Sequence, residues 1–120
     1  MDMLLAIDIG NTNIVIGGID RERTYFVERV TTAHGKTDME YAISLKSILE
    51  IHQISPASIE GAILSSVVPP LNAALSSAVK KICGFRPMLV GAGMKTGLNI
   101  LMDNPKTVGS DMIVDAVAAI

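Results

Sequence analysis

The sequence predicts an α/β fold in which helices pack on a mixed β-sheet. Two observations carry this prediction. The first 30 residues read as three short β-rich runs whose connections are too short for a helical crossover, so they form an antiparallel meander. From residue 37 onward, helical periodicity alternates with short apolar runs, as in parallel strands joined by helices. The expected order is β-β-β-α-β-α-β, followed by a loop and a final helix.

The meander is expected to use residues 3–9, 14–19 and 24–30 as its strands. Gly10 allows a tight turn between the first two strands, and Asp20 to Arg23 forms the turn of the second hairpin. The chain therefore reverses twice before its first helix begins.

The first helix is predicted to begin at Thr37 or Asp38 and to run to about His52. Its apolar positions recur at helical spacing, at Tyr41, Ala42, Leu45, Ile48, Leu49 and Ile51. Ser55-Pro56 lies in the connection that follows, and residues 59–65 read as a buried strand.

The second helix is predicted to begin at Pro69 and Pro70, because a missing N–H costs least in the first helical turn. Its apolar face comprises Leu71, Ala74, Leu75, Ala78, Val79 and Ile82. Gly84 ends this helix, and residues 87–90 form another short strand.

Composition limits the class of protein. The 120 residues suffice for one domain at most; 49% are hydrophobic and 18% charged, so the chain can bury a core. A net charge of −2, two Tyr, two Phe and no Trp give little support to nucleic-acid binding. We expect no signal peptide and no membrane span. Cys83, the only cysteine, reads as a buried small apolar residue and not as a nucleophile, and it suits a reducing cytoplasm.

The turn Asp8-Ile9-Gly10-Asn11-Thr12 carries the first set of chemical groups. Without a Cβ at Gly10, a polyphosphate can approach the backbone, and the amides of Asn11 and Thr12 can point at its oxygens. Asp8 repels a phosphate, so its presence suggests a Mg²⁺ ion that bridges the two anions. The alternative is an ordinary hairpin whose Asn and Gly only shape the turn.

A second set of groups lies late in the chain, in the segment 103–111. Residues 91–97 read as a connection before it, Asn99 to Met102 as an optional short strand, and a helix as starting near Met112. Asp111 either caps this helix or acts as a general base that takes a proton from a substrate hydroxyl.

Four motifs in order resemble those of type III pantothenate kinases. They are Asp8-Ile9-Gly10-Asn11-Thr12, Ser65-Ser66-Val67-Val68-Pro69, Gly93-Met94-Lys95-Thr96-Gly97-Leu98, and Asp103-Asn104-Pro105 through Gly109-Ser110-Asp111. This family belongs to the superfamily of acetate and sugar kinases, heat-shock ATPases and actin. The resemblance implies a ribonuclease-H-like (actin-like ATPase) domain, with this chain as the N-terminal half of a two-half kinase.

The resemblance implies transfer of the γ-phosphoryl group of ATP to pantothenate, giving 4'-phosphopantothenate, the first step of coenzyme A biosynthesis. Asp8 would hold Mg²⁺, while Gly10, Asn11 and Thr12 would bind the phosphates of ATP. Asp111 would be the catalytic base. The substrate-binding residues carried over are Met102, Gly109, Ser110, Asp111 and Met112. A monovalent cation, K⁺ or NH₄⁺, and a homodimer of the two-half protein are also implied.

Two positions depart from the family pattern. Many members have an arginine directly after the base and often a tyrosine nine residues before it, where this chain has Met112 and Met102. A non-catalytic regulatory or accessory protein that binds nucleotide on the same fold is therefore the alternative function, and an actin-like module that polymerises or binds partners is a third. The chain also stops inside an apolar segment at Ile120, so we expect the second half to be absent and this chain alone to be inactive.

Other polar residues receive lesser roles. Ser65 and Ser66 are expected to line the cleft or to form a turn, because no histidine is spaced to make a hydrolase triad with them. His34 is expected in a solvated loop and His52 on the helix surface, and no zinc site has suitable ligand spacing.

Overall fold

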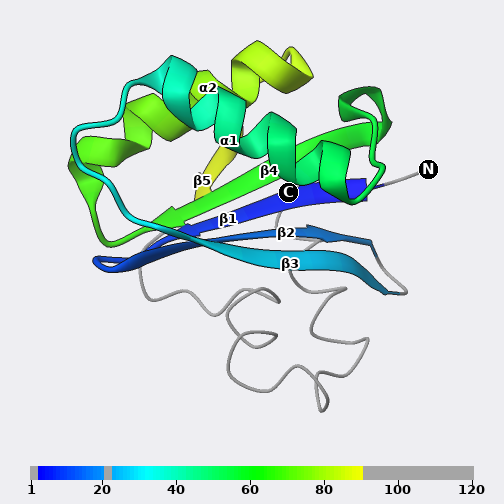
Figure 1. Ribbon diagram of the computed structural model, residues 1–120, viewed down its shortest axis with the longest axis horizontal. Helices are drawn as coiled ribbons and strands as arrows, with labels where there is room; N and C mark the ends of the chain where they lie inside the picture. The colour runs from blue at the N-terminus through cyan, green and yellow to red at the C-terminus, as the bar shows by residue number, and fades with distance from the viewer. Residues whose placement is uncertain (1–2, 21–22, 91–120) are drawn as a thin grey trace.

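The computed structural model describes residues 3–20 and 23–90, which form one sheet with helices on one of its faces (Figure 1). The strands are β1 (Met3–Ile9), β2 (Asn13–Ile19), β3 (Thr24–Thr31), β4 (Ile59–Ser66) and β5 (Met88–Val90), and the helices are α1 (Asp38–Ile51) and α2 (Asn72–Cys83). Two short 3₁₀ turns, η1 (Pro56–Ser58) and η2 (Pro69–Leu71), precede β4 and α2. The predicted element order from the first strand to the fifth is confirmed.

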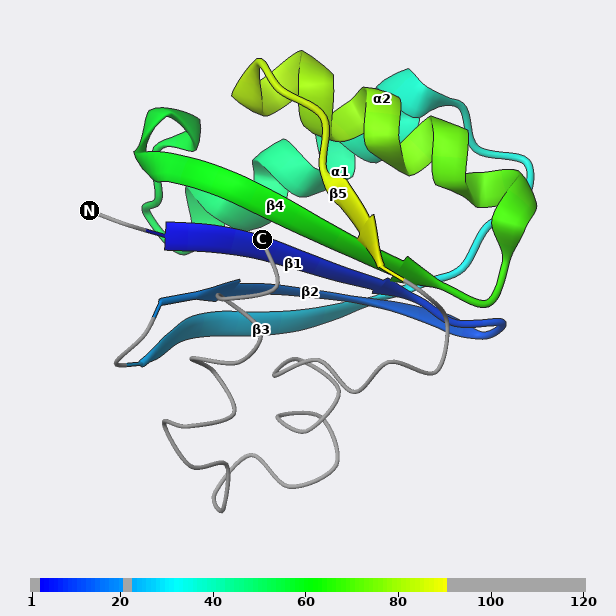
Figure 2. The ribbon, with the colours of Figure 1, turned by 180° about the vertical axis from the view of Figure 1, so that it is seen from behind.

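The sheet is mixed, as predicted. Its strand order is β3-β2-β1-β4-β5, with antiparallel pairing of β1 to β2 and of β2 to β3, and parallel pairing of β1 to β4 and of β4 to β5. Figure 2 shows from behind how β4 lies beside β1 with β5 at the edge. The central strand β1 therefore has an antiparallel neighbour on one side and a parallel neighbour on the other.

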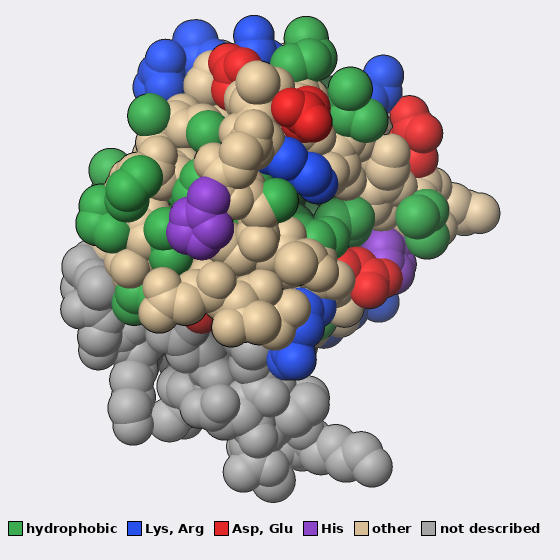
Figure 3. Space-filling model, turned by 60° about the vertical axis from the view of Figure 1, so that its left-hand side comes forward, with side chains coloured by type: hydrophobic (Ala, Val, Ile, Leu, Met, Phe, Trp, Pro, Cys, Tyr) green, Lys and Arg blue, Asp and Glu red, His purple; other side chains and the backbone are tan. Residues whose placement is uncertain are grey.

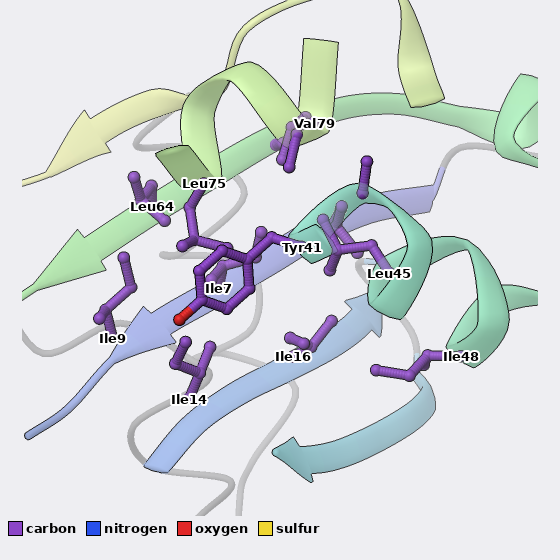
Figure 4. Close-up of a cluster of buried hydrophobic side chains, with 14 of the residues drawn as sticks. Ile7, Ile9, Ile14, Ile16, Tyr41, Leu45, Ile48, Leu64, Leu75 and Val79 are labelled. Carbon is purple, nitrogen blue, oxygen red and sulfur yellow. The ribbon is translucent and has the colours of Figure 1, made fainter. Parts of the chain in front are cut away.

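The core lies between the sheet and the two helices. Alternate residues of β1, Leu5, Ile7 and Ile9, are at most 2% exposed and belong to this core, as expected for a strand with one face against helices. Tyr41 and Leu45 from α1 and Leu75 from α2 close over them (Figure 4). Burial of this apolar surface, rather than helix propensity, is what holds α1 and α2 in place.

Helix ends follow the local sequence. Thr37 caps α1 with a reciprocal pair of hydrogen bonds, since its side chain accepts from the Glu40 N–H and the Glu40 side chain accepts from the Thr37 N–H. Gly84 ends α2 in the left-handed conformation, at φ 87°, as predicted for a glycine after a helix. The proline prediction needs a correction: Pro69 and Pro70 form the separate turn η2, and α2 begins only at Asn72. Two successive rings set φ without supplying N–H groups, which suits a short 3₁₀ turn.

The His52 side chain is 30% exposed, but it makes two contacts that the sequence did not predict. His52 ends α1, its ring stacks on Phe26 of β3 at 4.9 Å between centroids, and its Nε2 lies 2.6 Å from Glu28 Oε2. The helical pattern gave no sign of this contact, because the partners come from a strand 24 residues earlier.

On the face shown in Figure 3, Lys and Arg side chains are interspersed with Asp and Glu, and hydrophobic side chains lie among them. Across the described ranges, no helix is long and apolar enough to cross a membrane. The connection 91–97, the optional strand at Asn99 to Met102 and the helix from Met112 fall outside the described residues.

Candidate functional site

The turn between β1 and β2 is as tight as predicted. The Gly10 N–H donates to the Asn13 carbonyl oxygen at 2.9 Å, which leaves Asn11 and Thr12 as an exposed two-residue connection. A Cβ built on Gly10 would lie 2.9 Å from the same Asn13 oxygen, closer than real Cβ contacts. Glycine at position 10 is therefore required by a close backbone approach.

Asp8 sits two residues before this turn, on the sheet face opposite the helices, because Ile7 and Ile9 on either side of it point into the core. It pairs in register with Ser65 on the parallel strand β4. Ser65 is 7% exposed, and its Oγ donates to Asp8 Oδ1 at 2.8 Å. One carboxylate oxygen of Asp8 is thereby fixed by a buried hydroxyl, which orients the half-buried side chain beside the turn.

The end of β4 is joined to the end of β1. The Val67 N–H donates to the Ile9 carbonyl at 3.0 Å, and the Val68 N–H donates to Ser66 Oγ at 2.9 Å. The carboxyl ends of these two parallel strands thus meet beside the Asp8 turn. Ligands of open α/β sheets commonly bind outside the carboxyl ends of the strands.

The described part of the site brings together four of the predicted residues, Asp8, Gly10, Asn11 and Thr12. The groups fit a phosphate with a bound divalent cation, because the exposed turn residues offer backbone N–H groups to an anion while the carboxylate beside them offers oxygen ligands. Within residues 3–20 and 23–90, no group of three or more His, Cys, Asp or Glu side chains is placed to hold a metal. A cation at Asp8 would therefore share its coordination with phosphate and water oxygens.

The predicted residues of the substrate end, Met102, Gly109, Ser110, Asp111 and Met112, lie outside the described residues. Their placement stays a prediction.

Sequence reasoning missed one contact of the site, the hydrogen bond from Ser65 to Asp8. It assigned Ser65 and Ser66 only to lining or turn positions. The signal was the pair of serines that ends an otherwise apolar strand, but the register that sets Ser65 opposite Asp8 follows from the pairing of strands far apart in sequence.

Cys83 packs against the core as a small apolar residue, as predicted, but it is only partly buried. It is the last residue of α2, it is half-buried against the core, and burial raises the pKa of its thiol to about 11. At neutral pH it is a thiol and not a nucleophilic thiolate.

Comparison with solved structures identifies the fold. The chain resembles ROK hexokinase from Thermus thermophilus with a TM-score of 0.57 and 14% identity, over 74% of this chain and 35% of that one. It also resembles RuvC from T. thermophilus, in complex with a Holliday junction substrate, with a TM-score of 0.52 and 13% identity, over 95% of this chain and 80% of that one. These likenesses confirm the predicted ribonuclease-H-like fold.

Sequence comparison then identifies the family. The family model described as type III pantothenate kinase matches residues 4–120, and the chain belongs to that family. Relatives named type III pantothenate kinase come from Halalkalibacterium halodurans, 46% identical, Geobacillus sp., 45% identical, and Bifidobacterium animalis subsp. lactis, 42% identical. Each match covers 98% of this chain and 46% of the relative, so the chain spans about half the length of the curated relatives it matches.

Proposed function

We propose that the protein containing this chain transfers the γ-phosphoryl group of ATP to pantothenate and so forms 4'-phosphopantothenate, the first step of coenzyme A biosynthesis. The observation that carries the proposal is the match of the type III pantothenate kinase family over residues 4–120. The close turn at Gly10 beside an oriented Asp8 supports it, because this geometry suits a nucleotide phosphate.

We further propose that residues 1–120 form the first half of a two-half kinase. The relatives are about twice as long as the matched region, which leaves room for a second half of similar size. On this basis the isolated chain binds phosphate groups weakly and does not catalyse phosphoryl transfer.

At the phosphate end, the chain's own contribution is positioning. The exposed turn residues Asn11 and Thr12 present backbone N–H groups and a hydroxyl toward the β- and γ-phosphates, and Gly10 adds no side chain beside them. Asp8 would hold Mg²⁺, with its orientation set by Ser65. When bound, this ion neutralises charge that develops on the transferring phosphoryl group.

At the substrate end, Asp111 is proposed to accept the proton of the attacking pantothenate hydroxyl. Met102, Gly109, Ser110 and Met112 are proposed to line the pocket around that hydroxyl. The pocket holds the acceptor oxygen in line with the γ-phosphate, since phosphoryl transfer depends mainly on alignment and charge neutralisation.

The remaining proposals concern conditions and assembly. A monovalent cation, K⁺ or NH₄⁺, is proposed as a further cofactor, a homodimer as the assembly of the two-half protein, and the cytoplasm as its location. Neither nucleic acid nor a membrane is proposed as a partner.

The test uses the product of the complete open reading frame that contains this chain. ADP release is followed with Mg-ATP and K⁺, with and without pantothenate, and 4'-phosphopantothenate is identified by mass spectrometry. Pantothenate-dependent ADP release is the expected result. The Asp111→Asn variant should lose about 10²-fold or more in kcat while ATP binding persists, because a general base contributes that much. Full activity in that variant would remove Asp111 from the role of base.

The same assay addresses the regulatory alternative, which Met102 and Met112 keep open. Binding of ATP without pantothenate-dependent ADP release would favour a non-catalytic relative.

A further inference from the structure

The turn that we assign to phosphate binding is held from outside by one threonine. Thr32, the first residue after β3, makes two hydrogen bonds to it. Its backbone N–H donates to the Thr12 carbonyl at 2.9 Å, and its Oγ1 donates to the Gly10 carbonyl at 2.8 Å. Thr32 therefore binds carbonyl oxygens on both sides of the peptide that joins Asn11 to Thr12.

These two bonds decide which way the turn's amides face. In a trans peptide the C=O and N–H groups point in opposite directions. The Gly10 carbonyl shares its peptide plane with the Asn11 N–H, so the bond from Thr32 Oγ1 directs that N–H away from Thr32. The carbonyl oxygens of Gly10 and Thr12, which would repel an anion, accept hydrogen bonds from Thr32. The Asn11 N–H, which attracts an anion, is left to face outward.

Thr32 is itself anchored by the hydrophobic core. The next residue, Ala33, has both backbone groups bonded to the Tyr41 hydroxyl, which donates to the Ala33 carbonyl at 2.6 Å and accepts from the Ala33 N–H at 3.2 Å. Tyr41 is 1% exposed, and its ring lies in the core with the hydroxyl directed toward the ends of the strands at Ile9 and Ile14 (Figure 4). A continuous set of bonds thus runs from α1 through Tyr41, Ala33 and Thr32 to the turn.

We propose that Thr32 is a positioning residue for nucleotide phosphate, which acts by presenting the Asn11 amide and which Tyr41 holds in place from the core. This inference rests on the proposed function, because it assigns a role within the same site. Thr32 touches the turn and not the phosphate, so its loss should change how well the turn is preorganised and leave the pantothenate end unaffected.

The experiment compares Thr32→Val with Thr31→Val in the product of the complete open reading frame. Valine keeps the shape of threonine and removes only the hydroxyl. Thr31 is an exposed threonine on the neighbouring position of β3, which makes it a matched control. Thr32→Ser restores the hydroxyl, and Tyr41→Phe removes the anchor while keeping the ring.

One hydrogen bond of ordinary strength corresponds to about a five- to tenfold change in an equilibrium. In Thr32→Val, kcat/KM for ATP should therefore fall about five- to tenfold while KM for pantothenate stays within about twofold. Amide hydrogen exchange at Gly10, whose N–H closes the turn by donating to the Asn13 carbonyl, should become faster by a similar factor. Thr32→Ser should recover most of the loss, Tyr41→Phe should show part of it, and Thr31→Val should match the unsubstituted protein.

Two results overturn the inference. One is a Thr32→Val protein that equals Thr31→Val in both ATP kinetics and amide exchange at Gly10, and the other is a Thr32→Ser protein as impaired as Thr32→Val. If Thr32→Val fails to fold, Tyr41→Phe decides by the same two readouts. Absence of pantothenate-dependent ADP release from the unsubstituted protein would defeat the proposed function instead, and amide exchange at Gly10 would still test the link from Thr32 to the turn.

Discussion

Replacing Gly10 with alanine tests whether the close backbone approach in the turn matters. The added Cβ would lie 2.9 Å from the Asn13 carbonyl oxygen, whereas ordinary contacts begin at 3.4 Å. That oxygen must retreat by about 0.5 Å, although it is also the acceptor of the Gly10 N–H at 2.9 Å. The substitution therefore strains the bond that closes the turn.

The expected cost combines a weakened hydrogen bond with local strain, which amounts to about 1–2 kcal/mol in the free energy of unfolding. Nucleotide binding should suffer as well, because the amides of Asn11 and Thr12 move with the turn. We expect Gly10→Ala to weaken ATP affinity by about tenfold or more, since misplacement of a binding group by a fraction of an ångström has effects of this order.

Gly35→Ala provides the matched control. A Cβ at Gly35 meets no atom within 4 Å, and the backbone there has no positive φ. This variant should be neutral or more stable by up to about 1 kcal/mol, because alanine restricts the unfolded chain. For both variants, urea unfolding measures the free energy of unfolding and calorimetric titration with Mg-ATP measures the affinity for ATP. Equal stability and equal ATP affinity in Gly10→Ala and Gly35→Ala would refute the reasoning about the turn.

Three further substitutions test other contacts. Ser65→Ala removes the buried donor to Asp8 and should lower the free energy of unfolding by about 1–2 kcal/mol; the loss should shrink when Asp8 is already alanine, and an unchanged loss in that double-mutant cycle would contradict the contact. Asp38 has a pKa held below its ordinary value of 3.8, first by the hydrogen bond from the Ser77 hydroxyl, so its stabilising effect is present above pH 4 and is lost as the pH falls through its folded-state pKa. Asp38→Asn should therefore be less stable than the unsubstituted protein at pH 6, and the difference should diminish on acidification; a constant difference in pH-dependent thermal unfolding would speak against this. Leu75→Ala empties a fully buried site and should cost about 2–5 kcal/mol in chemical unfolding, against less than about 0.5 kcal/mol for Ile43→Ala at a position that is 59% exposed.

The strands and helices of the described part were predictable because each leaves a local signal. A short apolar run marks the strand Met3–Ile9, helical spacing after Thr37 marks Asp38–Ile51, and Gly84 marks the end of the second helix. The family was also predictable, because its motifs are short runs of residues that stand in a fixed order along the chain.

Contacts between distant segments were not predictable in the same way. Two examples are the contacts of His52 with Phe26 and Glu28 and the hydrogen bond from Ser65 to Asp8. Both depend on which strands and helices lie side by side in the fold. A periodic pattern tells which face of an element is apolar, but it does not tell which residue lies across from a given side chain.

The sequence by itself determined the order of the described elements and the family, since local periodicity and short motifs depend on neighbours in the chain. Only the tertiary structure decided how the turn is held. The register of β4 on β1 brings Ser65 to Asp8, and the packing of Tyr41 in the core fixes the segment from which Thr32 binds the turn. Those bonds join residues 22 and 57 positions apart, and they form because burial of the shared core brings their strands together.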